Sequence, residues 1–261
     1  MTRSLSSIKL VITVGCCNES CANVFLSLPC IYILHIYAHA PGVVIIGEGN
    51  LSFSFALGAY LMLDDPWDVI KTTVYEKHVV EGFISKGREI AKKKCKLNYR
   101  LLNAGHDPNA SDLIEKYERI DELPSLQMYT GVNAVDLYAT LPPEVLPFVT
   151  EFEFCLWFQC PWVDYHSAGE EGTFDLISKF LSSASQVQAP GNHVMIGIMN
   201  IHPYVTHYQL LELFYHTQYT FIGFDSSLVT EILYYGYKYQ SRMRLNGAEQ
   251  SHVTLVFEKR R

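Results

Sequence analysis

Gly47 and Gly49 stand two residues apart, directly after the apolar and mostly β-branched run at residues 43–46. Such a run is typical of a strand buried on both faces, and apolar residues at helical spacing begin again at Phe53. A strand, a glycine turn and a helix start form a place where a nucleotide-like ligand approaches the backbone and the N–H groups of the helix. The spacing is G-x-G-x-x-S, so Ser52 takes the place of a third glycine and offers a helix cap. By itself the pattern also fits an ordinary glycine turn.

An acidic side chain at the end of the next strand would complete such a site. Residues 71–75 predict this strand, and Glu76 follows it at once. In dinucleotide and adenosine sites an acid at this place accepts hydrogen bonds from ribose hydroxyls. The alternative is a solvated glutamate that begins the next helix.

The segment GEGNLSFS at residues 47–54 resembles the opening of the ribosomal RNA uridine-N3 methyltransferase-like family, which reads GEG(D/N)-x-S-F-S. Further matches follow in family order and extend the resemblance over residues 41–257. The resemblance implies an α/β, Rossmann-like class I methyltransferase fold: a seven-stranded, mostly parallel sheet with helices on both faces. It also implies S-adenosyl-L-methionine as cofactor. The cofactor-binding residues that it implies are Gly47, Glu48, Gly49, Ser52, Glu76 and Asn133.

The chain departs from the family at the adenine-binding position. Residues 132–137 read VNAVDL where the family has V-D-A-T-x-L. Asn133 keeps a carbonyl acceptor for the adenine amine and loses the charge, and Asp136 is three residues too far along the chain to replace it simply. We therefore expect weaker cofactor binding than in a typical member.

The chain also departs from the family at the implied reaction centre. Residues 158–162 read FQCPW where the family has F-N-F-P-H, at the carboxyl end of the predicted fourth strand. Gln159 would supply a carbonyl to the nitrogen being methylated and Trp162 a flat ring for the base. Pro161 matches the proline that base N-methyltransferases carry between these two positions. These departures favour a changed substrate or lost activity. The alternative is a plain strand end with Trp162 packed in the core.

A tyrosine-rich and basic segment, residues 233–244, is the most RNA-like surface in the sequence, because bases stack on rings while cations meet phosphates. The family carries a Gly-Tyr segment and basic residues at this point. The alternative is a tyrosine-rich hairpin edge. The expected RNA-binding residues are Tyr237, Lys238, Tyr239, Arg242 and Arg244.

Composition limits the partners. The 261 residues carry a net charge of −7, which argues against a uniformly basic surface, so RNA must meet a local patch or be brought by a partner. The lysine run at 92–94 ends a predicted helix at 78–95, where it would complement the helix dipole. The seven cysteines form no disulfide framework and favour a reducing compartment.

Residues 1–40 form an apolar extension of uncertain status before a single domain at 41–261. Their unbroken apolar runs are too short for a spanning helix, so we expect no stable membrane insertion. Three hypotheses remain for the extension: a strand or helix packed on the domain, a membrane-associated segment, or a zinc site of the C-x3-C-x13-H-x3-H type. The four residues of that zinc pattern are Cys17, Cys21, His35 and His39.

The remaining elements follow from apolar periodicity. The predicted strands are 43–46, 71–75, 126–131, 152–158, 193–199, 219–224 and 252–257. Besides 78–95 and the helix that starts after the glycine turn, the predicted helices are 172–187 and 206–216. Residues 107–120 predict another helix or an insertion that covers the sheet edge.

The resemblance implies a methyltransferase acting on a uridine N3 of large-subunit ribosomal RNA. Its partners would be ribosomal RNA or the pre-ribosome and not DNA. A sulfonium methyl donor needs no metal. The resemblance implies a nucleolar or nuclear location, with the cytoplasm as alternative. Two other hypotheses stay open: a scaffold with a degraded site, and a methyltransferase for another substrate.

Overall fold

The computed structural model describes thirteen stretches of the chain. They are residues 10–12, 24–26, 42–47, 51–61, 69–74, 80–105, 110–119, 127–151, 154–163, 172–199, 210–225, 228–238 and 252–261.

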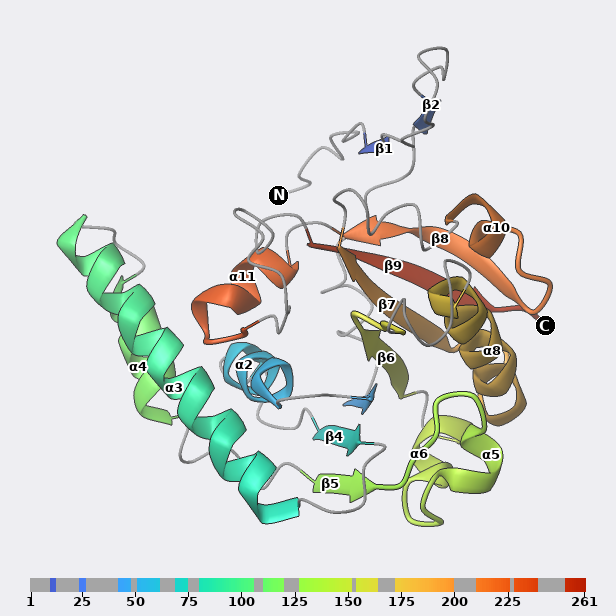
Figure 1. Ribbon diagram of the computed structural model, residues 1–261, viewed down its shortest axis with the longest axis horizontal. Coiled ribbons are helices and arrows are strands. Elements are labelled where there is room, and N and C mark those ends of the chain that lie inside the picture. Colours follow the sequence, from blue (N-terminus) through green and yellow to red (C-terminus); the bar gives the residue numbers. More distant parts are fainter. Residues whose placement is uncertain are drawn as a thin grey trace.

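One seven-stranded sheet forms the centre of the protein (Figure 1). Its strands lie in the order β5-β4-β3-β6-β7-β9-β8. The five strands from β5 to β7 are joined by parallel pairs, whereas β9 runs antiparallel to both β7 and β8. The strand bounds are β3 (Gly42–Ile46), β4 (Val69–Val74), β5 (Gln127–Thr130), β6 (Cys155–Gln159), β7 (His193–Met199), β8 (Tyr219–Asp225) and β9 (His252–Lys259). This arrangement confirms the predicted class I methyltransferase fold.

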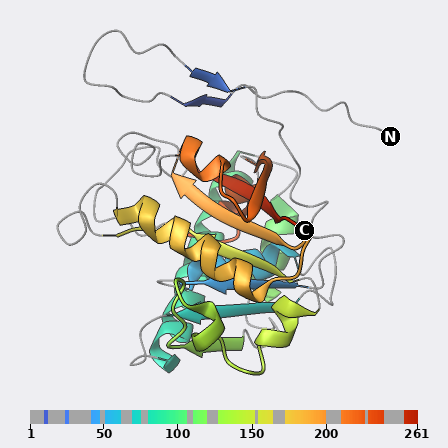
Figure 2. The same cartoon turned by 90° about the vertical axis from the view of Figure 1, so that its right-hand side faces the viewer.

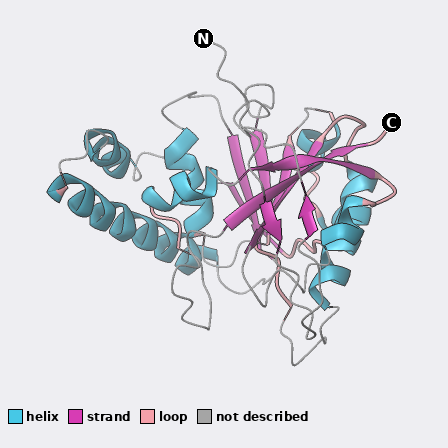
Figure 3. Ribbon diagram, turned by 90° about the horizontal axis from the view of Figure 1, so that it is seen from above, coloured by secondary structure: helices cyan, strands magenta, loops and turns pink. Residues whose placement is uncertain are grey.

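Helices cover both faces of the sheet, which makes three layers (Figure 3). One face carries α2 (Ser52–Leu61), α3 (Val80–Ala104), α4 (Ala110–Arg119) and α11 (Leu228–Tyr234). The other carries α5 (Leu137–Thr140), α6 (Leu146–Thr150), α8 (Gly172–Val187) and α10 (Leu210–Phe214). In Figure 2 the long helix α8 runs across the sheet on that second face.

The strand β3 shows why the sheet is buried on both faces. Successive side chains of a strand point to opposite faces. Val44 and Ile46 belong to the core under α8, whereas Val43 and Ile45 belong to the core under α2 and α11. All four residues are completely buried, so the apolar run predicts the strand correctly.

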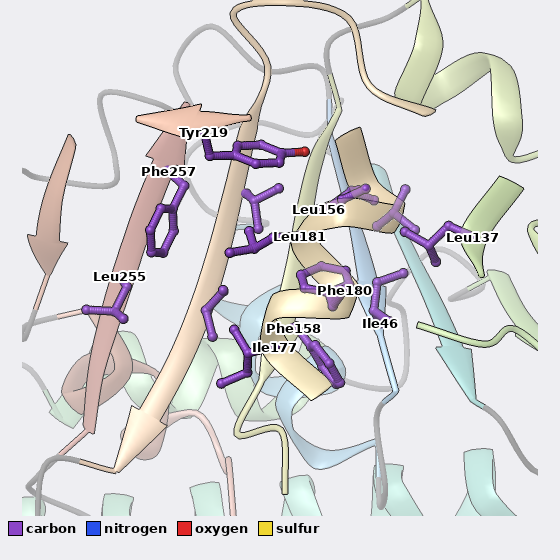
Figure 4. Packing of buried hydrophobic residues seen from close by; sticks show 14 of the residues in the cluster. Ile46, Leu137, Leu156, Phe158, Ile177, Phe180, Leu181, Tyr219, Leu255 and Phe257 are labelled. Carbon is purple, nitrogen blue, oxygen red and sulfur yellow. The ribbon is translucent and has the colours of Figure 1, made fainter. Parts of the chain in front are cut away.

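The core under α8 is built from apolar side chains of the helix and of the strands beneath it (Figure 4). Phe180 of α8 meets Phe158 of β6 with ring centroids 4.8 Å apart in an edge-to-face arrangement. Such a pair contributes about 0.5–1.5 kcal/mol beyond the area that it buries. This contact fixes the end of β6 that carries the candidate reaction centre.

The helix α3 corrects one prediction. It begins at Val80 and runs to Ala104, so the lysine run at 92–94 lies in its middle and its last turn holds no basic residue. Residues 96–104 are good helix formers for the most part, and the first glycine after the run is Gly105. The amide of Gly105 donates to the carbonyl oxygens of Leu101 and Leu102, which closes the helix. The lysine run therefore does not complement the end of a helix dipole.

In the amino-terminal forty residues, β1 (Leu10–Ile12) and β2 (Val24–Leu26) pair with each other in an antiparallel two-stranded sheet. The four residues of the proposed zinc pattern lie outside the described residues, so that hypothesis stays a prediction. Among the helices that the structure describes, none is both long and apolar enough to cross a bilayer.

Candidate functional site

The candidate site lies where β3 and β6 end side by side. These strands are parallel neighbours, with Ile46 in register with Phe158. The strand order reverses here, because β4 and β5 follow on one side of β3 while β6 and β7 follow on the other. In open α/β sheets ligands bind outside the carboxyl ends of strands at such a reversal. Gly47 and Gln159 are the residues that the two strands bring to this edge.

Gly47 has the backbone conformation that glycine permits most readily. Its φ angle is +67°, in the left-handed region, and a Cβ atom built on it would lie 3.0 Å from Cε2 of Phe158. Gly47 is exposed, and Leu51 at the start of the following helix also has a positive φ angle of 59°. The two described ends of the connection from β3 to α2 thus both have left-handed backbone, and the end at Gly47 is exposed. Glu48 and Gly49 lie outside the described residues and remain predicted cofactor contacts.

Ser52, the first residue of α2, is completely buried. Its hydroxyl donates to the carbonyl oxygen of Lys238 at 3.2 Å and accepts from the amide of Lys238 at 3.1 Å. These two hydrogen bonds join the start of α2 to the segment that follows α11. Ser52 therefore positions two elements beside the site.

The amide of Gln159 is held at both ends. Its Oε1 accepts from Nε1 of Trp157 at 2.9 Å, and its Nε2 donates to the hydroxyl of Tyr237 at 3.2 Å. A Cβ on Gly197 of the neighbouring strand would lie 2.0 Å from Oε1 of Gln159, so only glycine leaves room for this arrangement. The indole N–H of Trp157 thus occupies one lone pair of Gln159 Oε1. A target base would have to bind to the other lone pair.

The chain turns sharply after Gln159. Cys160 has a φ angle of +49°, which costs an ordinary residue about 1–2 kcal/mol, and its amide donates to the carbonyl oxygen of Gly197 at 2.9 Å. Burial raises the pKa of the Cys160 thiol to about 12, while its contact with the Tyr237 hydroxyl acts in the opposite direction. The thiol is therefore neutral at physiological pH and is no thiolate nucleophile.

Pro161 is buried and Trp162 is 40% exposed. The alternative in which Trp162 packs in the core is therefore wrong. A large aromatic surface next to the end of β6 is the geometry that a stacking contact with a flat base requires.

Asn133 lies in the loop after β5, two strands from β3. Its Oδ1 accepts from the amide of Val135 at 3.2 Å, and its backbone carbonyl accepts from the amide of Asp136 at 3.0 Å. The side chain thus shapes the turn in which it stands, and its predicted contact with an adenine amine stays a prediction. Glu76, expected between Asn133 and the glycine turn, lies outside the described residues.

Tyr237 contradicts its prediction as an RNA-stacking residue. It is only 5% exposed, and its ring packs against Phe53 at 5.2 Å and His252 at 5.6 Å between centroids. No face of the ring is therefore open to a base. Lys238 is exposed as expected, and the other predicted RNA-binding residues, Tyr239, Arg242 and Arg244, lie outside the described residues.

Two residues of the site carried no functional prediction. Trp157 orients Gln159, and Gly197 makes room for it. Residues two apart on a strand share a face, so the pair Trp157 and Gln159 was visible in the sequence. The contact with Gly197 was not, because it depends on the register between β6 and β7. Within the described stretches, no cluster of acidic, histidine and cysteine side chains is suited to hold a metal.

Comparison with known proteins adds the following. No family model and no curated protein sequence matches this chain. The crystal structure of the 16S rRNA methyltransferase KamB is similar over 88% of this chain and 93% of its own, with 12% identity and a TM-score of 0.42. TrmN from Thermus thermophilus matches 87% of this chain and 47% of its own, with 14% identity and a TM-score of 0.43. The N-methyltransferase NodS from Bradyrhizobium japonicum WM9 matches 87% and 91%, with 10% identity and a TM-score of 0.42. Because these identities and TM-scores are low, the fold assignment rests on the strand order of this chain and not on the similar structures.

Proposed function

We propose that this protein is an S-adenosylmethionine-dependent methyltransferase that acts on a base nitrogen of RNA. The observation that carries the proposal is the exposed, left-handed Gly47 at the end of β3, directly beside the end of β6 where the strand order reverses. A backbone that must stay free of a Cβ at this edge suits a cofactor that lies against it.

Two further described residues support the proposal, one toward the cofactor and one toward the target base. Asn133 retains a carbonyl lone pair for an adenine amine after forming its turn. Trp162 offers an exposed ring at the end of β6 for the target base. We further propose that Glu48, Gly49 and Glu76 complete the cofactor contacts at the methionine and ribose ends.

Bound S-adenosylmethionine would supply an activated methyl group on a sulfonium, so the protein's contribution is mainly orientation. Trp162 would hold the base flat, and the second lone pair of Gln159 Oε1 would accept the proton-bearing edge of the base. The bond from the Trp157 indole fixes that carbonyl in direction. Preorganisation of this kind avoids reorientation at the moment of transfer.

The finer assignment is uridine N3 of large-subunit ribosomal RNA, supported by the resemblance of residues 47–54 to the uridine-N3 methyltransferase-like family. Its partners would then be ribosomal RNA or the pre-ribosome, in the nucleolus, the nucleus or the cytoplasm. The test is a nucleoside map by mass spectrometry of ribosomal RNA from a strain lacking the gene. Loss of one N3-methyluridine, restored by the wild-type gene, is the expected result; unchanged N3-methyluridine would refute this substrate.

One observation favours a second function, a binding or scaffold protein that keeps the fold. Both ends of the Gln159 amide are already bonded within the protein, to Trp157 and to Tyr237. Cofactor binding without turnover on any RNA would support this second function. Turnover on a substrate other than ribosomal RNA would instead support a methyltransferase of different specificity.

A further inference from the structure

The helix α3 concentrates positive charge in an acidic protein. Its 25 residues include seven Lys or Arg and two Glu, whereas the whole chain has a net charge of −7. Because the lysine run lies in mid-helix, the helix dipole gives no reason for it. One strongly basic helix in an acidic protein is a place where an anionic partner can bind.

The buried face of α3 fixes which side chains point outward. Ala91 and Cys95 are completely buried, and a Cβ on Gly236 would lie 2.1 Å from the carbonyl oxygen of Ala91. On the same face, Nδ2 of Asn98 donates to the carbonyl oxygen of Leu233 at 2.9 Å. This face is thus closed by α2 and by the end of α11. Figure 1 shows α3 at the outer side of its layer.

The opposite face carries a line of cations at helical spacing, which we call the basic stripe. It consists of Lys86, Lys93, Lys96 and Arg100, all exposed. The interval from 86 to 100 corresponds to about 21 Å along a helix. Glu89 is the one acid in line with the stripe, and Lys86, Lys93 and Arg100 form no salt bridge within the described part of the chain.

Two of the cations near the stripe also contact an aromatic ring of the neighbouring helix. Lys92 and Lys96 place Nζ 5.5 Å and 5.9 Å from the ring centroid of Tyr117 in α4. Such contacts hold the ammonium groups in place and leave them charged. Lys93 and Arg100 are exposed members of the stripe for which no contact with an aromatic ring of α4 is found among the described residues.

We propose that the basic stripe of α3 binds the phosphate backbone of RNA. A phosphate chain presents one negative charge at each nucleotide. As a partner for an extended line of cations it is therefore better suited than a compact acidic patch on another protein. In the sequence five residues separate the end of β4 at Val74 from the start of α3 at Val80, and parallel pairing places the carboxyl ends of β4, β3 and β6 at one edge of the sheet. RNA lying on α3 would therefore reach the sheet edge that holds Gly47 and Gln159. This inference deepens the proposed function and names its RNA contact, which the predicted Tyr237 does not supply.

The exposed residues Leu97 and Leu101, 49% and 65% exposed, border the stripe. An amphipathic acidic protein segment would use these leucines together with the cations, whereas a phosphate backbone uses the cations alone. The two partners are therefore distinguished by substitution of the leucines.

The test measures binding of the full chain to a fluorescent RNA hairpin by anisotropy at several salt concentrations, without cofactor. The variant Lys93→Gln/Arg100→Gln removes two cations of the stripe. The matched control Lys179→Gln/Arg261→Gln removes two exposed cations from α8 and the carboxyl end. We expect the stripe variant to weaken binding at least about tenfold and to flatten the slope of log K against log salt by roughly 1.5–2, with no such change in the control. Leu97→Ser/Leu101→Ser should leave RNA affinity unchanged.

Three results would overturn the inference: no RNA binding by the wild type, equal loss in stripe variant and control, or equally tight binding of an amphipathic peptide of alternating Glu and Leu that depends on Leu97 and Leu101. Cofactor binding is measured separately on the same samples. RNA binding through the stripe without cofactor binding would refute the proposed methyl transfer and leave the RNA surface standing. Cofactor binding without RNA binding would do the reverse.

Discussion

The side chain of Gln159 donates from Nε2 to the hydroxyl of Tyr237, 3.2 Å away, although the two residues are 78 positions apart in the chain. This bond connects the end of β6 to the segment after α11. The bonds between Ser52 and Lys238 connect the same segment to α2. The sequence predicts an RNA-binding surface in this segment. At Tyr237 the segment instead packs beside the site and holds β6 and α2 together through hydrogen bonds.

Removal of the Tyr237 hydroxyl should destabilise the protein. In Tyr237→Phe the Nε2 group of Gln159 loses its oxygen acceptor in a partly buried place and keeps only the weaker sulfur acceptor of Cys160, which costs about 1–2 kcal/mol. Urea unfolding measures the loss, with Tyr215→Phe as control because Tyr215 is 82% exposed. Equal stability of the two variants would show that the bond contributes nothing.

The fit between Gly197 and Gln159 should appear as coupling between two substitutions. Gly197→Ala forces the Gln159 amide aside, and we expect a cost of about 1–3 kcal/mol. In a Gln159→Ala background the space is free, so the same change at Gly197 should cost much less. Unfolding free energies of the four proteins in the cycle test this, and additive costs would contradict the close packing.

The hydroxyl of Ser52 should control the exchange of a single amide. Ser52→Ala removes the acceptor of the Lys238 N–H, so this amide should exchange faster with solvent deuterium. The variant should also lose about 1–2 kcal/mol of stability. Ser85→Ala, on the exposed side of α3, is the matched control. Unchanged exchange at Lys238 in Ser52→Ala would rule out the bond in solution.

His216 should make stability depend on pH. Burial lowers the pKa of its imidazole below 6.5, the nearby charge of Arg260 acts in the same direction, and a hydrogen bond with the Ser178 backbone opposes both. Because the folded pKa is depressed, the unfolded chain takes up the proton first as the pH falls. The stabilising contribution is therefore complete above pH 6.5 and is lost as the pH falls from there to the folded pKa.

Urea midpoints between pH 5 and 8 test this dependence, with His216→Gln flattening the curve below pH 6.5. His193→Gln on β7 serves as the comparison variant. A curve for His216→Gln that parallels the wild type would assign the pH dependence to other groups.

The sequence predicted the sheet well because its signals are local. The apolar run of β3 and the amphipathic pattern of α8 each determine an element without reference to distant residues. The lysine run predicts an end of α3 nine residues too early, because basic residues often mark the last helical turn, whereas no glycine or proline follows before Gly105. The signal that ends the helix, Gly105, is local and can be identified in the sequence.

The candidate site was predictable only in part. Gly47 could be found, because its glycine turn follows a clear strand. The burial of Tyr237 could not, since it depends on Phe53, His252 and Gln159, which lie far away in the sequence and meet only in the folded sheet. A segment rich in aromatic and basic residues gives the same sequence pattern whether its rings face solvent or the core.

The most direct test of the central claim is calorimetric titration of S-adenosylmethionine and S-adenosylhomocysteine into the full chain and two glycine variants. Gly47→Ala places a Cβ at the candidate site, 3.0 Å from Phe158. Gly191→Ala imposes the same kind of left-handed strain, with φ +90°, at a turn where nothing lies within 4 Å. Thermal melting of all three proteins confirms that each is folded.

We expect the wild type and Gly191→Ala to bind the cofactor with micromolar affinity, and Gly47→Ala to bind it at least about tenfold more weakly. No heat and no thermal shift for the folded wild type at millimolar cofactor would contradict this expectation. Equal affinity of the wild type and Gly47→Ala would also contradict it, because the cofactor would then lie elsewhere.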